Sequence, residues 1–312
     1  MYDLLAVGEL NVDIVLNGLK QPPALGMEIL AEGYTECMGS STAICACAAA
    51  SLGMKTAFFG KLGTDAHGRL VSQTLRRYGV ETGGIITGDD YRTGVTVSIS
   101  TSSDRALVTY FGDTIDCFGA EEVELERLRA RHLHVGSYFL QSKLHPGLHA
   151  LFRQAHEMGM TTSLDAGWDE TGGWRTSLGD VLAYTDFFFP NEKEAQAITG
   201  CSDMVPAACA LAGMGCTAVV KLGGRGSLAC RAGGEKVISA GPLQTHVVDT
   251  TGAGDSFNAG FLCAFVEGKK LEECLVYGNA AGAVSVTRVG GTAQCPTRRE
   301  VEEAIRTGVV KA

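Results

Sequence analysis

The most informative chemistry in the chain lies in residues 252–255, which read Gly-Ala-Gly-Asp. A helical pattern follows at once, because large apolar side chains recur every four residues at Phe257, Phe261 and Phe265. Residues 252–255 are therefore expected to form the first turn of a buried helix that ends near Gly268. The N–H groups of such a turn have no intrahelical acceptor, and glycine lets an anion approach them. The run is thus predicted to be an anion site of the kind that binds phosphate.

Asp255 is the unexpected member of this run, because a carboxylate repels a bound anion. One interpretation is helix capping, since Asp is common at helix N-termini. The other is a general base, which takes the proton from a hydroxyl group as that group attacks a phosphoryl group. The spacing alone leaves both interpretations open.

A match to a known family is carried by residues 249–261, which read Asp-Thr-Thr-Gly-Ala-Gly-Asp-Ser-Phe-Asn-Ala-Gly-Phe. This stretch closely resembles the C-terminal signature of the ribokinase-like (pfkB) family of carbohydrate kinases, which includes fructokinases and adenosine kinases. The resemblance implies that Asp255 is the base and that it forms an anion hole with three neighbours, Gly252, Ala253 and Gly254. It also implies a monovalent cation such as K+ at Asp249 and Thr251, where many relatives bind one.

A second group of polar residues lies near the start of the chain. Residues 3–8 form a short apolar run, suited to a strand that is buried on both faces. Glu9, Asn11 and Asp13 follow at alternate positions, so they can share one side of the chain. This pattern suits an ordinary strand end, but ligands also bind at the carboxyl ends of strands in α/β sheets. The segment resembles the family's first sugar-contacting motif, which implies that Asn11 and Asp13 bind the substrate.

Residues 39–53 are rich in Ala, Ser and Cys and are expected to form a tightly packed helix. They resemble the family's N-terminal signature, which begins with two glycines and carries an Asn five positions after the first. Here Gly39 is kept, but Ser40 replaces the second glycine and Ile44 replaces the Asn. The resemblance places substrate contacts at Gly39, Ser40 and Ala43, and the two departures argue against ribose as the substrate.

The remaining expected contacts lie on the nucleotide side. Residues 186–190 are expected to form a strand, and Asn191 with Glu194 reads as a helix N-cap followed by an acidic first turn. The same pair resembles a family motif in which the Asn lies near the phosphates and the Glu organises Mg2+ through its water shell. A nucleotide site for ATP is further implied at the end of the strand 216–222 and its glycine loop. The residues concerned are Lys221, Gly223, Gly224 and Gly226, with Asn279 beside the adenine.

Strands and helices alternate along the whole chain without a linker, which predicts one α/β domain over residues 1–312 with a mostly parallel sheet. The resemblance implies the three-layer αβα ribokinase-like fold. It also implies a small β-sheet lid formed by insertions at about 14–37 and 93–111, with a turn at 101–104. Such a flap is unstable alone, and relatives often bury it in a homodimer. Asp65 is interpreted as the cap of a helix.

Composition limits the classes of partner. The chain has 312 residues and a net charge of −9, which argues against nucleic acid or an anionic membrane as a partner. Its eleven cysteines include no C-x-x-C pair and are interpreted as buried free thiols in a reducing compartment. No signal peptide or transmembrane run is visible, so the protein is expected to be cytoplasmic. Two histidine pairs have spacings that suit zinc, but neither has a third ligand, so metal catalysis by histidine is rejected.

These features predict an ATP- and Mg2+-dependent kinase that phosphorylates a primary hydroxyl group of a small sugar or sugar-like alcohol. A nucleoside or vitamin kinase of the same fold would keep every phosphate-side residue and differ at the substrate side. A ligand-binding regulator without activity is the alternative from another class, although the base and the anion run are both intact. A Rossmann dehydrogenase is excluded because no G-x-G-x-x-G follows the first strand.

Overall fold

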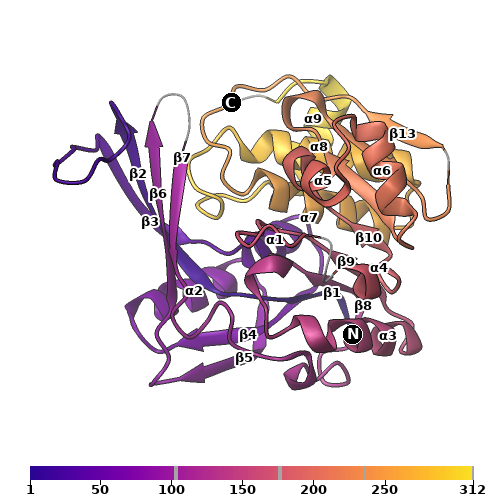
Figure 1. Cartoon of the computed structure of the whole chain (residues 1–312), viewed down its shortest axis with the longest axis horizontal. Helices are drawn as coiled ribbons and strands as arrows, with labels where there is room; N and C mark the ends of the chain where they lie inside the picture. Colours follow the sequence, from indigo (N-terminus) through magenta and orange to yellow (C-terminus); the bar gives the residue numbers. More distant parts are fainter. Residues whose placement is uncertain (102–104, 175–177, 235, 311–312) are drawn as a thin grey trace.

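Two β-sheets organise the chain in the computed structural model shown in Figure 1. The structure describes residues 1–101, 105–174, 178–234 and 236–310. The larger sheet A lies in the body of the molecule, and the smaller sheet B projects from one side of it (Figure 1). The turn expected at 101–104 falls largely outside the described residues.

Sheet A has nine strands within the described ranges, in the order β13-β12-β11-β10-β9-β8-β1-β4-β5. Neighbours pair in parallel from β11 to β5, whereas β12 and β13 add an antiparallel hairpin at one edge. The mostly parallel sheet is thus confirmed, but the strand expected at 186–190 is shortened to Phe187–Phe188. The strands are β1 Tyr2–Val7, β4 Thr56–Gly63, β5 Glu81–Gly88, β8 Ala130–Val135, β9 Thr161–Leu164, β10 Phe187–Phe188, β11 Thr217–Lys221, β12 Ser227–Cys230 and β13 Val237–Ala240.

Helices cover both faces of sheet A. Successive residues of a strand point to opposite faces of the sheet, so each buried strand contributes apolar side chains to both faces. In β1, Leu4 and Ala6 join one apolar cluster, and Leu5 and Val7 join the other. The first face packs against α1 Ser41–Ser51, α2 Ala66–Arg77, α7 Ala253–Val266, α8 Leu271–Ser285 and α9 Arg298–Thr307. The second packs against α3 His145–Glu157, α4 Gly179–Leu182, α5 Glu192–Thr199 and α6 Met204–Ala212. The expected three-layer arrangement is therefore confirmed.

Sheet B confirms the expected small second sheet. Its strands are ordered β3-β2-β6-β7, with bounds Gly33–Met38, Asn11–Leu19, Gly94–Thr101 and Arg105–Tyr110. Strand β2 begins directly after the carboxyl end of β1, so its first residues lie where the two sheets meet. Polar side chains of this sheet are thereby placed beside the ligand-binding edge of sheet A.

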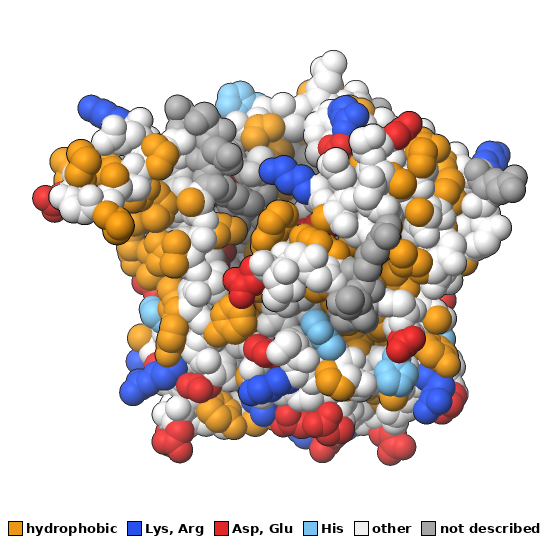
Figure 2. Space-filling model, viewed as in Figure 1, with side chains coloured by type: hydrophobic (Ala, Val, Ile, Leu, Met, Phe, Trp, Pro, Cys, Tyr) orange, Lys and Arg blue, Asp and Glu red, His pale blue; other side chains and the backbone are white. Residues whose placement is uncertain are grey.

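The lid exposes many apolar side chains, which Figure 2 shows as a group of orange atoms over sheet B. Leu25, Met27, Leu30, Leu107 and Val108 are each more than half exposed. A dimer through the lid would bury such a surface, and this dimer stays a prediction. None of the helices in the described part of the chain is long and apolar enough to span a membrane.

Asp65 caps α2, as the sequence indicated. Its Oδ1 accepts hydrogen bonds from Gly68 N at 2.8 Å and from Thr93 Oγ1 at 2.8 Å, while its Oδ2 accepts one from Thr93 N at 2.9 Å. The carboxylate therefore fastens the start of α2 to the residue that precedes β6 of the lid.

Replacing Asp65 with Ala should lower the free energy of unfolding by about 1–2 kcal/mol, because the first turn of α2 loses its acceptor. The measurement is the urea midpoint and slope. Asp65→Asn is the matched control, since it keeps an acceptor for Gly68 N. Equal losses in the two variants would contradict the capping role.

Candidate active site

The first turn of α7 presents backbone N–H groups that lack acceptors. Gly252 precedes the helix with a left-handed φ of 74°, and the N–H groups of Ala253 and Ser256 are bonded to Thr250 O and Gly252 O. Within the described residues, the N–H groups of Gly254 and Asp255 have no hydrogen-bond acceptor. Together with the positive end of the helix dipole, they form a site that attracts an anion.

Space is restricted at both glycines of the turn, and most strictly at Gly252. A Cβ atom on Gly252 would lie 2.9 Å from Gly291 Cα and 3.0 Å from Ile44 Cγ2. A Cβ atom on Gly254 would lie 3.3 Å from the Nζ of Lys221, so this ammonium group is directly beneath the anion turn. Backbone donors and one buried cation therefore converge on the same point.

A cavity of about 260 Å³ opens beside this turn. It brings together five residues that the sequence assigned to the nucleotide with two of the predicted anion hole. The nucleotide residues are Lys221, Gly223, Gly224, Gly226 and Asn279, and those of the anion hole are Ala253 and Gly254. Apolar side chains such as Val247, Leu243 and Val286 line the rest, which suits a flat aromatic base. Asn279 has a structural role in the wall as well, because its Nδ2 donates to Ala240 O at 3.1 Å and to Gly241 O at 3.0 Å.

Asp255 lies at the centre of the site, partly exposed, in the first turn of α7. Its Oδ1 accepts a hydrogen bond from the hydroxyl group of Ser41, which is the first residue of α1. Burial and the nearby Asp165 carboxylate raise the pKa of Asp255 to about 7, although the bond from Ser41 acts in the opposite direction. A carboxylate with such a pKa can accept a proton near neutral pH.

Asp165, Lys221 and Asn258 form a buried polar cluster under the turn. Asp165 Oδ2 accepts hydrogen bonds from Lys221 Nζ at 2.6 Å and from Asn258 Nδ2 at 2.6 Å. Burial alone would raise the pKa of Asp165, but the charge of Lys221 together with the hydrogen bonds from Lys221 and Asn258 lowers it. Burial likewise opposes the charge of Lys221, and Asp165 and Glu194 keep its pKa above the usual value. The cluster therefore remains an ion pair.

Asn191 and Glu194 form a reciprocal capping box at the start of α5. Asn191 Oδ1 accepts from Glu194 N at 3.0 Å, and Glu194 Oε2 accepts from Asn191 N at 2.8 Å. Burial and the Asp165 carboxylate raise the pKa of Glu194 to about 8. Three carboxyl groups, those of Asp165, Glu194 and Asp255, thus interact with one ammonium group. The raised pKa values of Glu194 and Asp255 reflect a local shortage of positive charge, which a hard divalent cation such as Mg2+, held through its waters, would supply.

The predicted substrate residues Asn11, Asp13 and Gly39 lie together at the junction of the two sheets. Asn11 Nδ2 donates to Asp13 Oδ1 at 3.1 Å and to Thr96 Oγ1 of the lid at 3.1 Å. A Cβ atom on Gly39 would collide with the Asp13 carboxylate, so only glycine leaves this space open. The Asp13 carboxylate and the Thr96 hydroxyl group are partly exposed and can bind hydroxyl groups, and the buried Asn11 amide holds the two in place.

Ser40 and Ala43 are committed to the interior. Ser40 has a left-handed φ of 68°, and its Oγ donates to Glu9 O at 2.6 Å while accepting from Ala43 N at 2.9 Å. Ala43 is fully buried. Glu9 is also buried, and its carboxylate accepts hydrogen bonds from Thr42 Oγ1 at 2.7 Å and from Ser137 Oγ at 2.9 Å. These residues hold the N-terminus of α1 against the end of β1.

Asp249 ties two loops together below the anion turn. Its Oδ1 accepts bonds from Thr251 N at 2.9 Å and Thr251 Oγ1 at 2.8 Å, and its Oδ2 accepts one from Gly290 N at 2.9 Å. Both carboxylate oxygens therefore have protein donors. The monovalent cation at Asp249 and Thr251 stays a prediction.

The sequence did not single out Ser41 or Asn258 as site residues. Asn258 had a detectable signal, because it follows Asp255 by three residues and so lies on the same face of a helix. Ser41 had a weaker one, its position directly after the Gly39-Ser40 pair of the N-terminal signature. Its contact with Asp255 spans 214 positions in the chain, which no local pattern reveals.

Comparison with known proteins gives one consistent result. The model of the pfkB family of carbohydrate kinases matches residues 1–298. An uncharacterised sugar kinase of Archaeoglobus fulgidus is 31% identical over 247 residues, which cover 78% of this chain and 96% of the relative. The structure of Arabidopsis thaliana ribokinase in complex with ribose and ATP has 27% identity and a TM-score of 0.82, and the match covers 98% of this chain and 99% of that one. Adenosine kinase from Sinorhizobium meliloti has 26% identity and a TM-score of 0.82, with 97% and 99% covered. The chain therefore belongs to the pfkB family, and it is a carbohydrate kinase with the ribokinase-like fold.

Proposed function

We propose that this kinase transfers the γ-phosphoryl group of ATP to a primary hydroxyl group of a small sugar or sugar-like alcohol, with Asp255 as the general base. The observation that carries the proposal is the position of Asp255. It shares the first turn of α7 with the unpaired N–H groups, and its carboxylate is bonded to a hydroxyl group, that of Ser41. A proton acceptor and an anion site are therefore adjacent, as phosphoryl transfer to an alcohol requires.

Each part of the site has a defined task in this reaction. The cavity beside α7 binds the nucleotide, with its base against the apolar wall near Val286. The N–H groups of Gly254 and Asp255 and the ammonium group of Lys221 stabilise negative charge on the transferring phosphoryl group. Asp255 takes the proton from the attacking hydroxyl group. Mg2+, when bound, neutralises phosphate charge, and Glu194 and Asn191 would hold it through its waters.

The acceptor is proposed to bind at Asn11, Asp13 and Gly39. Their carboxylate and amide groups suit hydroxyl groups, and Thr96 adds a lid hydroxyl group to the same surface. A nucleoside kinase is the second candidate, because an adenosine kinase shares the fold and Ser40 and Ile44 depart from the sugar-binding signature. A regulator without activity would need no intact base, and both Asp255 and the anion turn are present.

The deciding measurement is ADP release from Mg-ATP with sugars, sugar acids, polyols and nucleosides as acceptors. Asp255→Asn should reduce turnover by at least about 100-fold, because it removes the base but keeps the shape. ATP binding, followed by calorimetry, should persist in this variant. The exposed Asp180→Asn is the matched control and should be fully active. Undiminished turnover in Asp255→Asn would refute the mechanism.

The pH profile should report the ionisation of Asp255. Because the base must be charged and its pKa is raised to about 7, kcat/KM for the acceptor should fall about tenfold per unit below that pH. Ser41→Ala removes a bond that stabilises the carboxylate, so the acidic limb should move to higher pH while the KM for ATP stays unchanged. Ser41→Thr keeps a hydroxyl group and should restore the profile. An unmoved limb in Ser41→Ala would show that Ser41 does not act on Asp255.

Lys221 is expected to contribute both to the free energy of unfolding and to the binding of ATP, and the two effects can be measured separately. Lys221→Met leaves the buried Asp165 carboxylate unpaired and should lower the free energy of unfolding by about 3–5 kcal/mol. The double variant Lys221→Met/Asp165→Asn removes both charges and should regain most of that loss in urea denaturation. The KM for ATP should be higher than that of the native protein in both variants, since both lack the ammonium group beneath the anion turn. A normal KM in the double variant would assign Lys221 to stability alone.

A further inference from the structure

Two thiol groups lie side by side away from the catalytic centre. Cys209 belongs to α6, and Cys230 is the last residue of β12. The Sγ of Cys230 donates a hydrogen bond to the Sγ of Cys209, and the two sulfur atoms are 3.5 Å apart. All eleven cysteines fall within the described residues, and this is the one hydrogen bond between two sulfur atoms in the described part of the chain.

The two thiols differ in access. Cys230 is completely buried beneath α6, whereas Cys209 is partly exposed on the helix. Burial, with a further contribution from the bond to Cys209, raises the pKa of the Cys230 thiol to about 11, so this thiol is protonated in the resting protein. A reagent in solution therefore reacts with Cys209 first, and the buried Cys230 is then close enough to attack the Cys209 sulfur.

The two sulfur atoms are near enough to be joined after a small movement. A disulfide needs an S–S distance of about 2.05 Å, so the sulfur atoms must approach by roughly 1.5 Å. Ala208 and Leu211 of α6 belong to the same apolar cluster as Cys230, and the two thiols are in direct contact.

We propose that Cys209 and Cys230 form a reversible dithiol–disulfide site, oxidised by small-molecule disulfides. This inference goes beyond the proposed kinase reaction and does not rest on it. It assigns a chemical role to two of the cysteines that composition alone describes as inert thiols.

The exchange is balanced in two steps. The Cys209 thiolate attacks one sulfur of the small disulfide, which forms a mixed disulfide and releases one small thiol. Cys230 then attacks the Cys209 sulfur and gives its proton to the departing small thiolate, which forms the protein disulfide and releases the second small thiol. The protein loses two protons and two electrons, and the small disulfide gains both.

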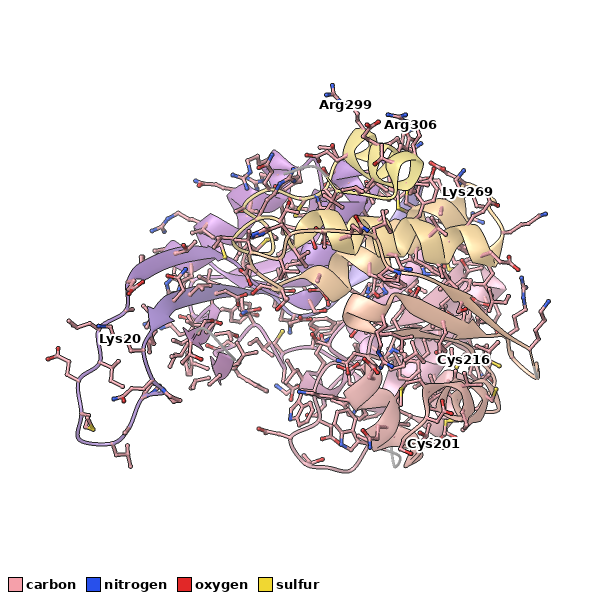
Figure 3. All side chains as sticks on the ribbon, turned by 90° about the horizontal axis from the view of Figure 1, so that it is seen from above. Lys20, Cys201, Cys216, Lys269, Arg299 and Arg306 are labelled. Carbon is pink, nitrogen blue, oxygen red and sulfur yellow. The ribbon has the colours of Figure 1, made fainter. Side chains whose placement is uncertain are left out.

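The bridge would enclose a functional segment. The chain between the two cysteines contains β11, Lys221 and the glycine loop at 223–226, all of which contribute to the nucleotide cavity. Closing this loop restricts the unfolded chain, so the oxidised protein should be more stable than the reduced one. Figure 3 labels Cys201 and Cys216, which lie on the side of the molecule away from Lys20.

The test is incubation of the native protein with oxidised glutathione, followed by intact mass and peptide mapping without reduction. We expect the loss of two hydrogen atoms, a peptide that joins Cys209 to Cys230, and reversal by dithiothreitol. Oxidation should also raise the thermal midpoint by a few degrees. A bridge that leaves the midpoint unchanged would refute the restraint on the enclosed segment.

Matched variants make the result specific. Cys201→Ser removes another partly exposed thiol that has no sulfur partner in the described part of the chain, and it should still form the bridge. Cys230→Ser should instead retain glutathione on Cys209, and Cys209→Ser should give no bridge. A persistent glutathione adduct on Cys209 of the native protein would overturn the proposal, as would a bridge from Cys230 to the buried Cys216.

Discussion

The site depends on one buried ion pair, between Asp165 at the end of β9 and Lys221 at the end of β11. Asn258 of α7 bonds to the same carboxylate oxygen, so three distant segments meet at one atom. Burying two charges is unfavourable unless each finds its partner, and here the distance of 2.6 Å provides it. The pair fixes the ammonium group beneath Gly254, where a bound phosphate would meet it. The contacts that fix α7 against sheet A therefore also fix the N–H groups of the anion turn relative to the Lys221 ammonium group.

The same pair sets the electrostatic balance around it. Asp165 keeps its charge because Lys221 is adjacent. This negative charge disfavours the ionised forms of Asp255 and Glu194. The pKa values of these two groups rise to about 7 and about 8, with burial as the larger cause. A carboxylate tuned in this way is a better proton acceptor at neutral pH than a solvated one, which is half protonated only near pH 4. A nucleotide that brings a divalent cation would supply the positive charge that the cluster lacks.

The sequence predicted features that depend on neighbouring residues, such as helix starts and caps, but it did not predict contacts between residues far apart in the chain. The helix after residue 252, the cap at Asp65 and the box of Asn191 with Glu194 are set by neighbours within four positions, so spacing reveals them. The parallel sheet follows from the alternation of strands and helices. The bond from Ser41 to Asp255 depends instead on the packing of α1 against α7, which only the complete fold determines. The irregular backbone of Ser40, whose hydroxyl group turns inward, was equally hidden, because a sequence does not show a left-handed φ.

The departures at Ser40 and Ile44 have a common structural consequence. Ser40 bonds to Glu9 O and caps α1, and Ile44 packs against Gly252 and Gly291 behind the anion turn. Both side chains therefore support the N-termini of α1 and α7 from inside, where a substrate cannot reach them. Asp13 and Thr96 of sheet B are partly exposed beside them, and the buried Asn11 joins the two. It follows that selectivity in this kinase should depend more on the lid than on the N-terminal signature. Exchanging lid residues should then change the preferred acceptor while leaving phosphoryl transfer intact.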